Sequence, residues 1–189
     1  VQQKLEKKAG DALSESLKEL MRHVNFSRIT IDDICEKAGV SRRNFYRHFR
    51  DKYELLSWIY DEDFVRFSVH HDEWTIWDYY PAICRNLYSD RSFYLNAFSV
   101  DGQNSFRCRC TELLYPLLMH DFGGAFDSVE DSHFFIDRIT NATFDSFVRW
   151  LSSEPCMPPD QYAALGKEKT RKLAAGILKI SEKPAAEIK

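Results

Sequence analysis

The fold of this chain is decided by residues 30–56, which read TIDDICEKAGVSRRNFYRHFRDKYELL. A first short helix is indicated by Thr30 as N-cap, by Asp33 in its first turn and by apolar residues spaced three and four apart. Gly39 permits the left-handed backbone conformation that ends such a helix. Ser41 then begins a second helix as its N-cap. Two short helices joined by a turn of about three residues have the spacing of a helix-turn-helix.

The second helix combines a buried side with a side suited to DNA. Phe45 and Phe49, four residues apart, form the buried side. The other positions carry hydrogen-bond donors or positive charge: Arg42, Arg43, Asn44, Tyr46, Arg47, His48 and Arg50. Such a surface suits the major groove. The pattern alone leaves open an alternative, an ordinary helical domain with a solvated basic face.

Helices on both sides support this pair. Asp51 as N-cap and Glu54 at its third position predict a helix that continues to about Val69. An apolar stripe predicts an amphipathic helix over residues 4–24 that packs on the pair, with the positions Leu13, Leu17, Leu20, Met21 and Val24.

The order of these residues resembles the signature of the TetR family of bacterial transcriptional regulators. The resemblance is carried by AGVS at residues 38–41 and by FYxHFxDKxEL at residues 45–55, and it covers residues 10–58. DGQNSF at residues 101–106, in a context rich in tyrosine and phenylalanine, looks like the C-terminal region of the branch that includes dihydroxyacetone-kinase regulators. In that family the helix after the motif transmits effector binding to the DNA-reading head.

The rest of the chain predicts an all-α fold. Breaks and apolar spacing indicate helices over residues 74–88, 91–100, 104–122, 130–153 and 160–180, and no segment alternates with a period of two. We therefore expect about nine helices in two domains. Residues 1–54 form a helix-turn-helix DNA-binding domain, and residues 55–189 form a helical effector-binding and dimerisation domain.

Charge and composition agree with this division. The net charge is −3, but residues 1–55 carry +3 and the remainder −6, so the predicted reading head is the basic part. No apolar run is long enough to cross a membrane and no apolar signal segment stands at the start, so we expect a cytoplasmic protein.

The sequence argues against an enzyme and against a metal or cofactor. Five cysteines form no Cys-x-x-Cys pair and fit reduced thiols better than a zinc or disulfide framework. His70 and His71 are adjacent, do not face a common point, and fit a polar loop better than a metal site. The motifs of serine hydrolases, P-loop nucleotide binding, dinucleotide binding and zinc proteases are all absent.

Roles in DNA binding follow from position and from the resemblance. The first turn of a recognition helix reaches base edges, which predicts base reading by Arg42, Arg43 and Asn44, while Arg47 could read bases or hold phosphate. The resemblance implies phosphate contacts for Tyr46, His48 and Lys52. Thr30 could offer phosphate a hydroxyl and a helix N-terminus. Family members commonly have a small residue in place of Arg43 and threonine or serine in place of Asn44, so the operator of this chain cannot be taken from its relatives.

Two further surfaces are expected in the C-terminal domain. A palindromic operator requires a homodimer, and the resemblance implies an interface of two helices from each subunit, with the candidates Phe144, Phe147, Val148, Leu151, Leu173 and Ile177. Large apolar side chains with a few polar groups indicate a pocket for an effector, either a small molecule or a protein. Its candidates are Tyr60, Phe64, Trp77, Tyr80, Phe98, Asn104, Arg107, His120, Asp137 and Asn141, although plain core packing also explains most of the aromatics.

Together these features predict a dimeric, sequence-specific regulator whose affinity for its operator changes when an effector binds. The resemblance favours a repressor, whereas an effector that prefers the DNA-binding form would make it an activator. The alternative is a helical protein-interaction module of the same fold that does not bind DNA by itself. DNA association that is insensitive to salt would indicate that alternative.

Overall fold

The computed structural model describes residues 2–64, 75–100, 105–125 and 128–181. In these residues the chain is helical and contains no strand, as predicted. The elements are α1 (Gln2–Met21), η1 (Phe26–Arg28), α2 (Ile31–Ala38), α3 (Arg42–His48), α4 (Lys52–Phe64), α5 (Ile76–Ser89), α6 (Arg91–Phe98), α7 (Phe106–Phe122), η3 (Gly123–Ala125), α8 (Val129–Ser152) and α9 (Pro159–Ser181). The predicted extension of α4 to Val69 and the pair His70 and His71 lie outside the described residues.

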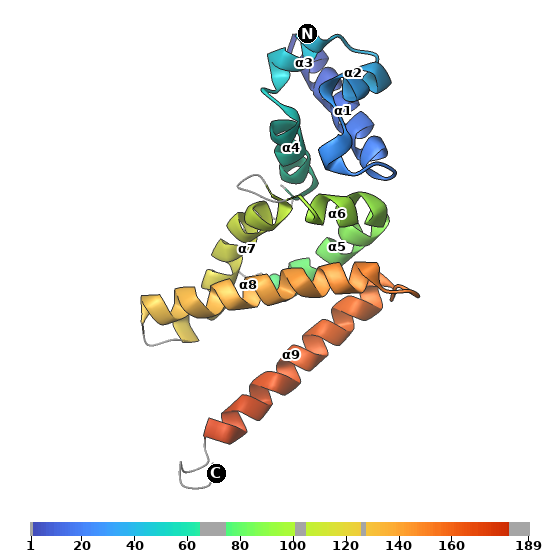
Figure 1. The fold of residues 1–189 in the computed structure, drawn as a ribbon. Helices are drawn as coiled ribbons and strands as arrows, with labels where there is room; N and C mark the ends of the chain where they lie inside the picture. Colours follow the sequence, from blue (N-terminus) through green and yellow to red (C-terminus); the bar gives the residue numbers. More distant parts are fainter. Residues whose placement is uncertain (1, 65–74, 101–104, 126–127, 182–189) are drawn as a thin grey trace.

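The first three α-helices form a small head at the N-terminal end of the molecule, and α4 leads from it to the remaining helices (Figure 1). We call α1 to α3, with η1, the head, and α5 to α9 the body. The apolar stripe of α1 is fully buried at Leu13 and Leu17, and it meets the buried faces of the short helices at Ile34 and Phe45. Phe49 continues this core towards α4, because its ring lies 5.9 Å from that of Trp58.

An aromatic cluster joins α4 to the body. Phe106 at the start of α7 has its ring centroid 4.6 Å from Tyr60 of α4 and 5.0 Å from Phe98 of α6. Phe98 in turn lies 4.9 Å from Phe144 of α8. Edge contacts at these distances are favourable beyond the area that they bury. Four helices therefore converge on Phe106, which is 1% exposed.

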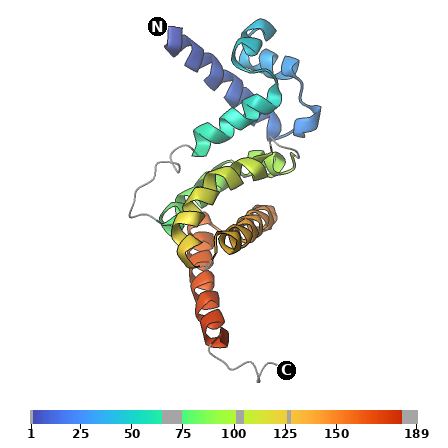
Figure 2. The same ribbon diagram turned by 90° about the vertical axis from the view of Figure 1, so that its left-hand side faces the viewer.

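Trp150 fixes the corner where α8 turns into α9. Its indole stacks on Tyr162 at 4.1 Å and on Tyr88 at 6.1 Å, and its Nε1 donates to the carbonyl of Met157. Gly166 brings α9 close to α5, since a Cβ there would lie 3.2 Å from the ring of Tyr80. Residues 167–172 are all exposed, and in both views the far end of α9 projects away from the rest of the chain (Figures 1 and 2).

Phe45→Ala tests the core of the head. Phe45 is fully buried, so losing its ring should lower the free energy of unfolding by about 3–5 kcal/mol. Chemical denaturation of Tyr46→Ala provides the comparison, because the neighbouring Tyr46 is 49% exposed and its loss should have a much smaller effect. Equal losses in the two variants would contradict the assignment of Phe45 to the core.

Candidate nucleic-acid interface

The turn between α2 and α3 has the geometry of a helix-turn-helix. Thr30 and Asp33 form a capping box at the start of α2, in which the backbone N–H of Asp33 donates to the Thr30 hydroxyl and that of Thr30 donates to the Asp33 carboxylate. Gly39 ends α2 at φ 66°, a conformation that other residues rarely adopt. Ser41 caps α3 by accepting from the backbone N–H of Asn44. Both short helices are thus held at both ends by local bonds.

α3 presents its outer face to solvent as predicted from the sequence. Phe45 and Phe49 hold its inner side in the core. Arg42, Arg43 and Arg47 are exposed, and Asn44 is half-buried near the N-terminus of the helix. An exposed helix with donors in its first turn has the shape and chemistry needed to enter a major groove.

Arg42 is held by the rest of the helix-turn-helix. Its Nη1 donates to both carboxylate oxygens of Asp32 on α2 at 2.9 Å, and its Nη2 donates to the Tyr46 hydroxyl at 3.3 Å. This pair is exposed, so its contribution to stability is small. Its effect is to orient the guanidinium before any contact with DNA.

The guanidinium groups of two arginines of the head have no hydrogen bond or ion pair in the described part of the chain. Arg43 lies in the first turn of α3, and Arg28 lies in η1, directly before the start of α2. The other described lysine ammonium and arginine guanidinium groups of the head all have partners. The sequence does not indicate a role for Arg28, because a single cation in a loop carries no distinctive pattern.

Lys52 faces inward. Its ammonium donates to the backbone carbonyls of Phe26, Ser27 and Ile29 at 2.8, 3.3 and 2.7 Å, and it lies 4.6 Å from the centroid of the Phe26 ring. Burial lowers the pKa of this group. A lysine ammonium has three N–H donors, so these three bonds occupy all of them, and the phosphate contact implied by the resemblance would require some to break.

The other residues expected to contact phosphate differ in availability. Tyr46 is exposed and shares a hydrogen bond with Arg42, and His48 is half-buried beside Phe49. The hydroxyl of Thr30 donates to Asp33, whose carboxylate occupies the N-terminus of α2. The backbone N–H of Thr30 and then its hydroxyl, which both donate to this carboxylate, hold the pKa of Asp33 below its ordinary value. The N-terminus of α2 is therefore already occupied by a negative charge.

The aromatic candidates for an effector pocket pack against each other. Tyr60 and Phe64 are buried at the junction with α7, and Phe98 packs on Phe144. Tyr80 stacks on Phe147 at 5.7 Å, and Trp77 lies beside it. These five side chains are therefore parts of the core, and Asn104 lies outside the described residues.

The polar candidates lie on the outside of the body. Arg107 donates to Asn141 at 2.9 Å and lies over the ring of Phe144, while the side chain of Asn141 also donates to the carbonyl of Asp137. His120 instead pairs with Asp121. The structure thus brings Arg107, Asp137 and Asn141 together and leaves His120 apart from them.

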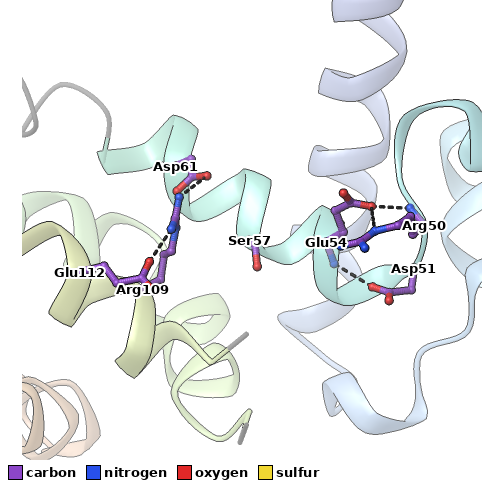
Figure 3. Close-up of a pocket in the computed structure, with 7 residues that line it drawn as sticks. All are labelled: Arg50, Asp51, Glu54, Ser57, Asp61, Arg109 and Glu112. Carbon is purple, nitrogen blue, oxygen red and sulfur yellow. Dashed lines mark hydrogen bonds and ion pairs between the residues drawn. The ribbon is translucent and has the colours of Figure 1, made fainter. Parts of the chain in front are cut away.

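A polar cleft of about 270 Å³ lies between α4 and α7. It is lined by Arg50, Asp51, Glu54, Ser57, Asp61, Arg109 and Glu112, and none of these is among the expected pocket residues. Figure 3 shows Arg109 reaching from α7 to Asp61, to which its Nε and Nη2 donate at 2.7 and 2.9 Å. Arg109 also pairs with Glu112, and Arg50 with Glu54. Both arginines that line this cleft are paired with carboxylates that also line it. The pair between Arg109 and Asp61 holds α7 to α4, and the paired arginines are not free to donate to a ligand.

The candidates for the dimer interface are mostly inside the subunit. Phe144, Phe147 and Leu151 are 5%, 5% and 0% exposed, and Val148 is half-buried. In this packing the three buried side chains offer little surface to a partner, whereas Val148 is partly accessible. The side chains of Leu173 and Ile177 on α9 lie outside the described part. The large apolar side chains exposed on α8 are Val129, Phe134 and Phe135.

Two family models match successive parts of the chain. Residues 15–58 match the family model described as bacterial regulatory proteins, tetR family, and residues 75–168 match the one described as transcriptional regulator C-terminal region. Neither describes a catalytic family. No helix among the described residues is long and apolar enough to cross a membrane.

A curated relative is similar over half of the chain. The HTH-type dhaKLM operon transcriptional activator DhaS of Lactococcus lactis subsp. lactis (strain IL1403) is 29% identical over 90 residues, which make up 47% of this chain. The match spans about half the length of that relative, at 48%.

Solved structures share the whole fold. The dihydroxyacetone kinase operon activator DhaS superposes with a TM-score of 0.61 at 22% identity, covering 91% of this chain and 97% of the other. A TetR transcriptional regulator from Streptococcus agalactiae 2603V gives a TM-score of 0.62 at 21% identity, covering 86% and 95%. At these identities the likeness is one of fold.

Lys52→Met distinguishes a structural role of this lysine from a contact with phosphate. The variant keeps the apolar stem and leaves three carbonyls without their donor, so the free energy of unfolding should fall by about 1–3 kcal/mol. Lys37→Met is the control, because Lys37 forms a surface ion pair with Glu19, and its loss should change stability by less than about 1 kcal/mol. Unchanged stability in Lys52→Met, with a flatter salt dependence of DNA binding, would instead assign Lys52 to phosphate.

Proposed function

The chain belongs to the TetR family of bacterial regulatory proteins, and we propose that it is a dimeric transcriptional regulator that binds a palindromic DNA operator. The observation that carries this proposal is the outer face of α3. This helix is capped at Ser41, fixed to the core by Phe45 and Phe49, and covered outside by donors. Arg28 and Arg43 lie in the same head and add positive charge that no carboxylate of the described residues neutralises.

The proposed contacts divide into reading and positioning. Arg43 and Asn44, in the first turn of α3, reach base edges, where arginine suits guanine and asparagine suits adenine. Arg42 and Arg47 extend the same surface. Arg28, Tyr46 and His48 hold the phosphate backbone and so set the register of the head without reading sequence. Thr30 and Lys52 contribute mainly by holding α2 and η1 in place.

The proposed partner is a second copy of the chain, with which it forms a homodimer. Residues 167–172 of the 23-residue helix α9 are all exposed, so this stretch of the helix is not stabilised by packing within its own subunit. The exposed Leu165 on α9, together with Phe134 and Phe135 on α8, supplies apolar surface for such a partner. Two-fold pairing through these helices places two heads side by side, as a palindromic site requires.

Regulation is proposed to reach the head through α4. This helix carries Tyr60 and Phe64 into the aromatic cluster and Asp61 into the ion pair with Arg109, so a shift of α7 moves α4 as well. An effector that binds one arrangement better than the other changes DNA affinity by that difference. We propose that the effector binds in the body, within the cytoplasm, where the operator lies.

The resemblance to the TetR family favours repression over activation. Activation is the second candidate, because the curated relative and one of the similar structures are both named as operon activators. A reporter gene placed behind the selected operator decides between them: deleting the regulator raises expression under repression and lowers it under activation.

Selection from a pool of random duplexes tests the proposed function. The purified protein should enrich a palindrome, and its affinity for that site should fall steeply between two salt concentrations, because phosphate contacts release bound counterions. Analytical ultracentrifugation should give a dimer. Retention of DNA without enrichment and without salt dependence would instead indicate a protein-interaction module.

Arg43→Ala and Arg28→Ala separate base reading from phosphate contact. On the selected site Arg43→Ala should cost about 1–3 kcal/mol and relax the preference at one base pair. Arg28→Ala should weaken selected and random duplexes alike and reduce the salt slope by about one. Arg85→Ala is the control, since it removes the same charge from the body, where Arg85 pairs with Asp160. Identical effects of the two head variants on both kinds of duplex would contradict the division of roles.

A further inference from the structure

One side chain of α6 joins the body to the head through three hydrogen bonds. The Nδ2 of Asn96 donates to the carbonyl of Met21, the last residue of α1, at 2.7 Å and to that of Val24 at 2.6 Å. Its Oδ1 accepts from the backbone N–H of Phe26 at 3.2 Å. Asn96 therefore bonds to backbone groups on both sides of the bend that separates α1 from η1.

Asparagine suits this position better than related side chains. Its amide offers two N–H donors and an oxygen acceptor within a short, planar group, and here both donors and the acceptor are in use. Aspartate has the same shape but would direct an oxygen at two carbonyl oxygens. Alanine would leave all three backbone groups without these partners. The bonds thus depend on the amide itself and not only on its size.

The other end of α6 is fixed to the corner between α8 and α9. Arg91, the first residue of α6, donates through Nε to the carbonyl of Leu151 and through Nη2 to that of Ser153 at 3.2 Å. It also pairs with Glu154 at 2.6 Å. Between the two ends, Phe93 and Ala97 are fully buried. A helix of eight residues thus connects the C-terminal end of α8 to the head.

Two other contacts cross the same junction. Arg22, the residue after α1, pairs with Asp90 through two hydrogen bonds of 2.8 and 2.7 Å, and Asp63 of α4 accepts from Lys18 and from the Tyr94 hydroxyl, both at 2.7 Å. The Arg22 side chain is 40% exposed, so salt screens that pair. The Asn96 bonds involve neutral groups and are insensitive to salt, so they keep the junction fixed at the ionic strengths at which DNA is bound.

We propose that Asn96 is a positioning residue that sets the distance between the two recognition helices of the dimer. The dimer contacts proposed for α8 and α9 fix the body, α6 connects their corner to the bend after α1, and Asn96 fixes the angle at which the head leaves α6. This inference rests on the proposed function, because the distance between the two recognition helices matters only if they bind two operator half-sites at a fixed spacing. Loss of the amide leaves α3 folded and loosens only its placement.

Two variants and a matched control test this role. Asn96→Ala removes the three bonds, and Asn96→Asp keeps the shape while replacing the donors. Asn25→Ala is the control, because the Asn25 side chain lies in the same bend but, among the described residues, bonds only to Ser27 of the head. Each protein is first examined by NMR for the hydrogen-exchange rate of the Phe26 amide, which reports directly on the bond to Asn96.

Each protein is then bound to duplexes that carry one half-site or two half-sites at a series of spacings, built from the palindrome that the wild-type protein selects. In both Asn96 variants the Phe26 amide should exchange faster, and affinity for the single half-site should stay at the wild-type value. The advantage of the best spacing should fall about tenfold, as expected when a net stabilisation of about 1.4 kcal/mol is lost. Asn25→Ala should keep the wild-type spacing profile.

Two results would overturn the inference. One is a wild-type spacing profile in both Asn96 variants, and the other is a parallel loss of half-site and palindrome binding, which reports an unfolded head rather than a misplaced one. If the wild-type protein enriches no duplex, the proposed function itself is wrong. If the wild-type protein selects one spacing and its Asn96 variants select it equally well, only the role of Asn96 is wrong.

Discussion

The segment between α1 and α2, which contains the bend and η1, has backbone carbonyls that receive no hydrogen bond from within a helix. The need to supply donors to these carbonyls determines how the head is built and how it is attached to the body. Carbonyls at a helix end and in a loop need donors when they are withdrawn from water. Two side chains supply them from different parts of the chain. Lys52, at the start of α4, donates to the carbonyls of Phe26, Ser27 and Ile29, and Asn96 of α6 donates to those of Met21 and Val24. The bend is consequently the point where head, α4 and body are joined.

This arrangement explains why few of the described positive charges of the head remain available for DNA. Lys18 and Arg22 bind carboxylates of α4 and of the residue before α6, and Lys52 is turned inward. Arg28 and Arg43 are exposed, and they come before and after α2 in the chain. A modest net charge of the head is therefore compatible with DNA binding, because what matters is which cations lack an internal partner and where they lie.

Much of the head could be read from the sequence, because its signals are local. Caps at Thr30 and Ser41, the glycine at position 39 and the paired rings of Phe45 and Phe49 act over three or four residues, and the structure has the helices where these signals place them. The all-α body was likewise indicated by its apolar spacing. The direction of Lys52 and the partners of Asn96 depend on residues more than twenty positions away, which periodicity does not report.

The outward faces of the body were harder to infer for a related reason. An apolar stripe such as Phe144, Phe147 and Leu151 shows that a helix is covered on that side, but not whether its own subunit or a partner covers it. Here the subunit covers it. The aromatic pocket candidates pose the same difficulty, since a ring that fills a core and a ring that lines a pocket obey the same spacing.

A crystal structure of the protein on its selected palindrome would test the central claim most directly. We expect α3 of each subunit in successive major grooves, about 34–36 Å apart, with Arg43 at a base edge and Arg28 at a phosphate. We also expect Lys52 and Asn96 to keep their bonds to the bend. A complex in which α3 stays outside the groove, or in which Lys52 leaves the bend to bind phosphate, would contradict the proposed mode of binding.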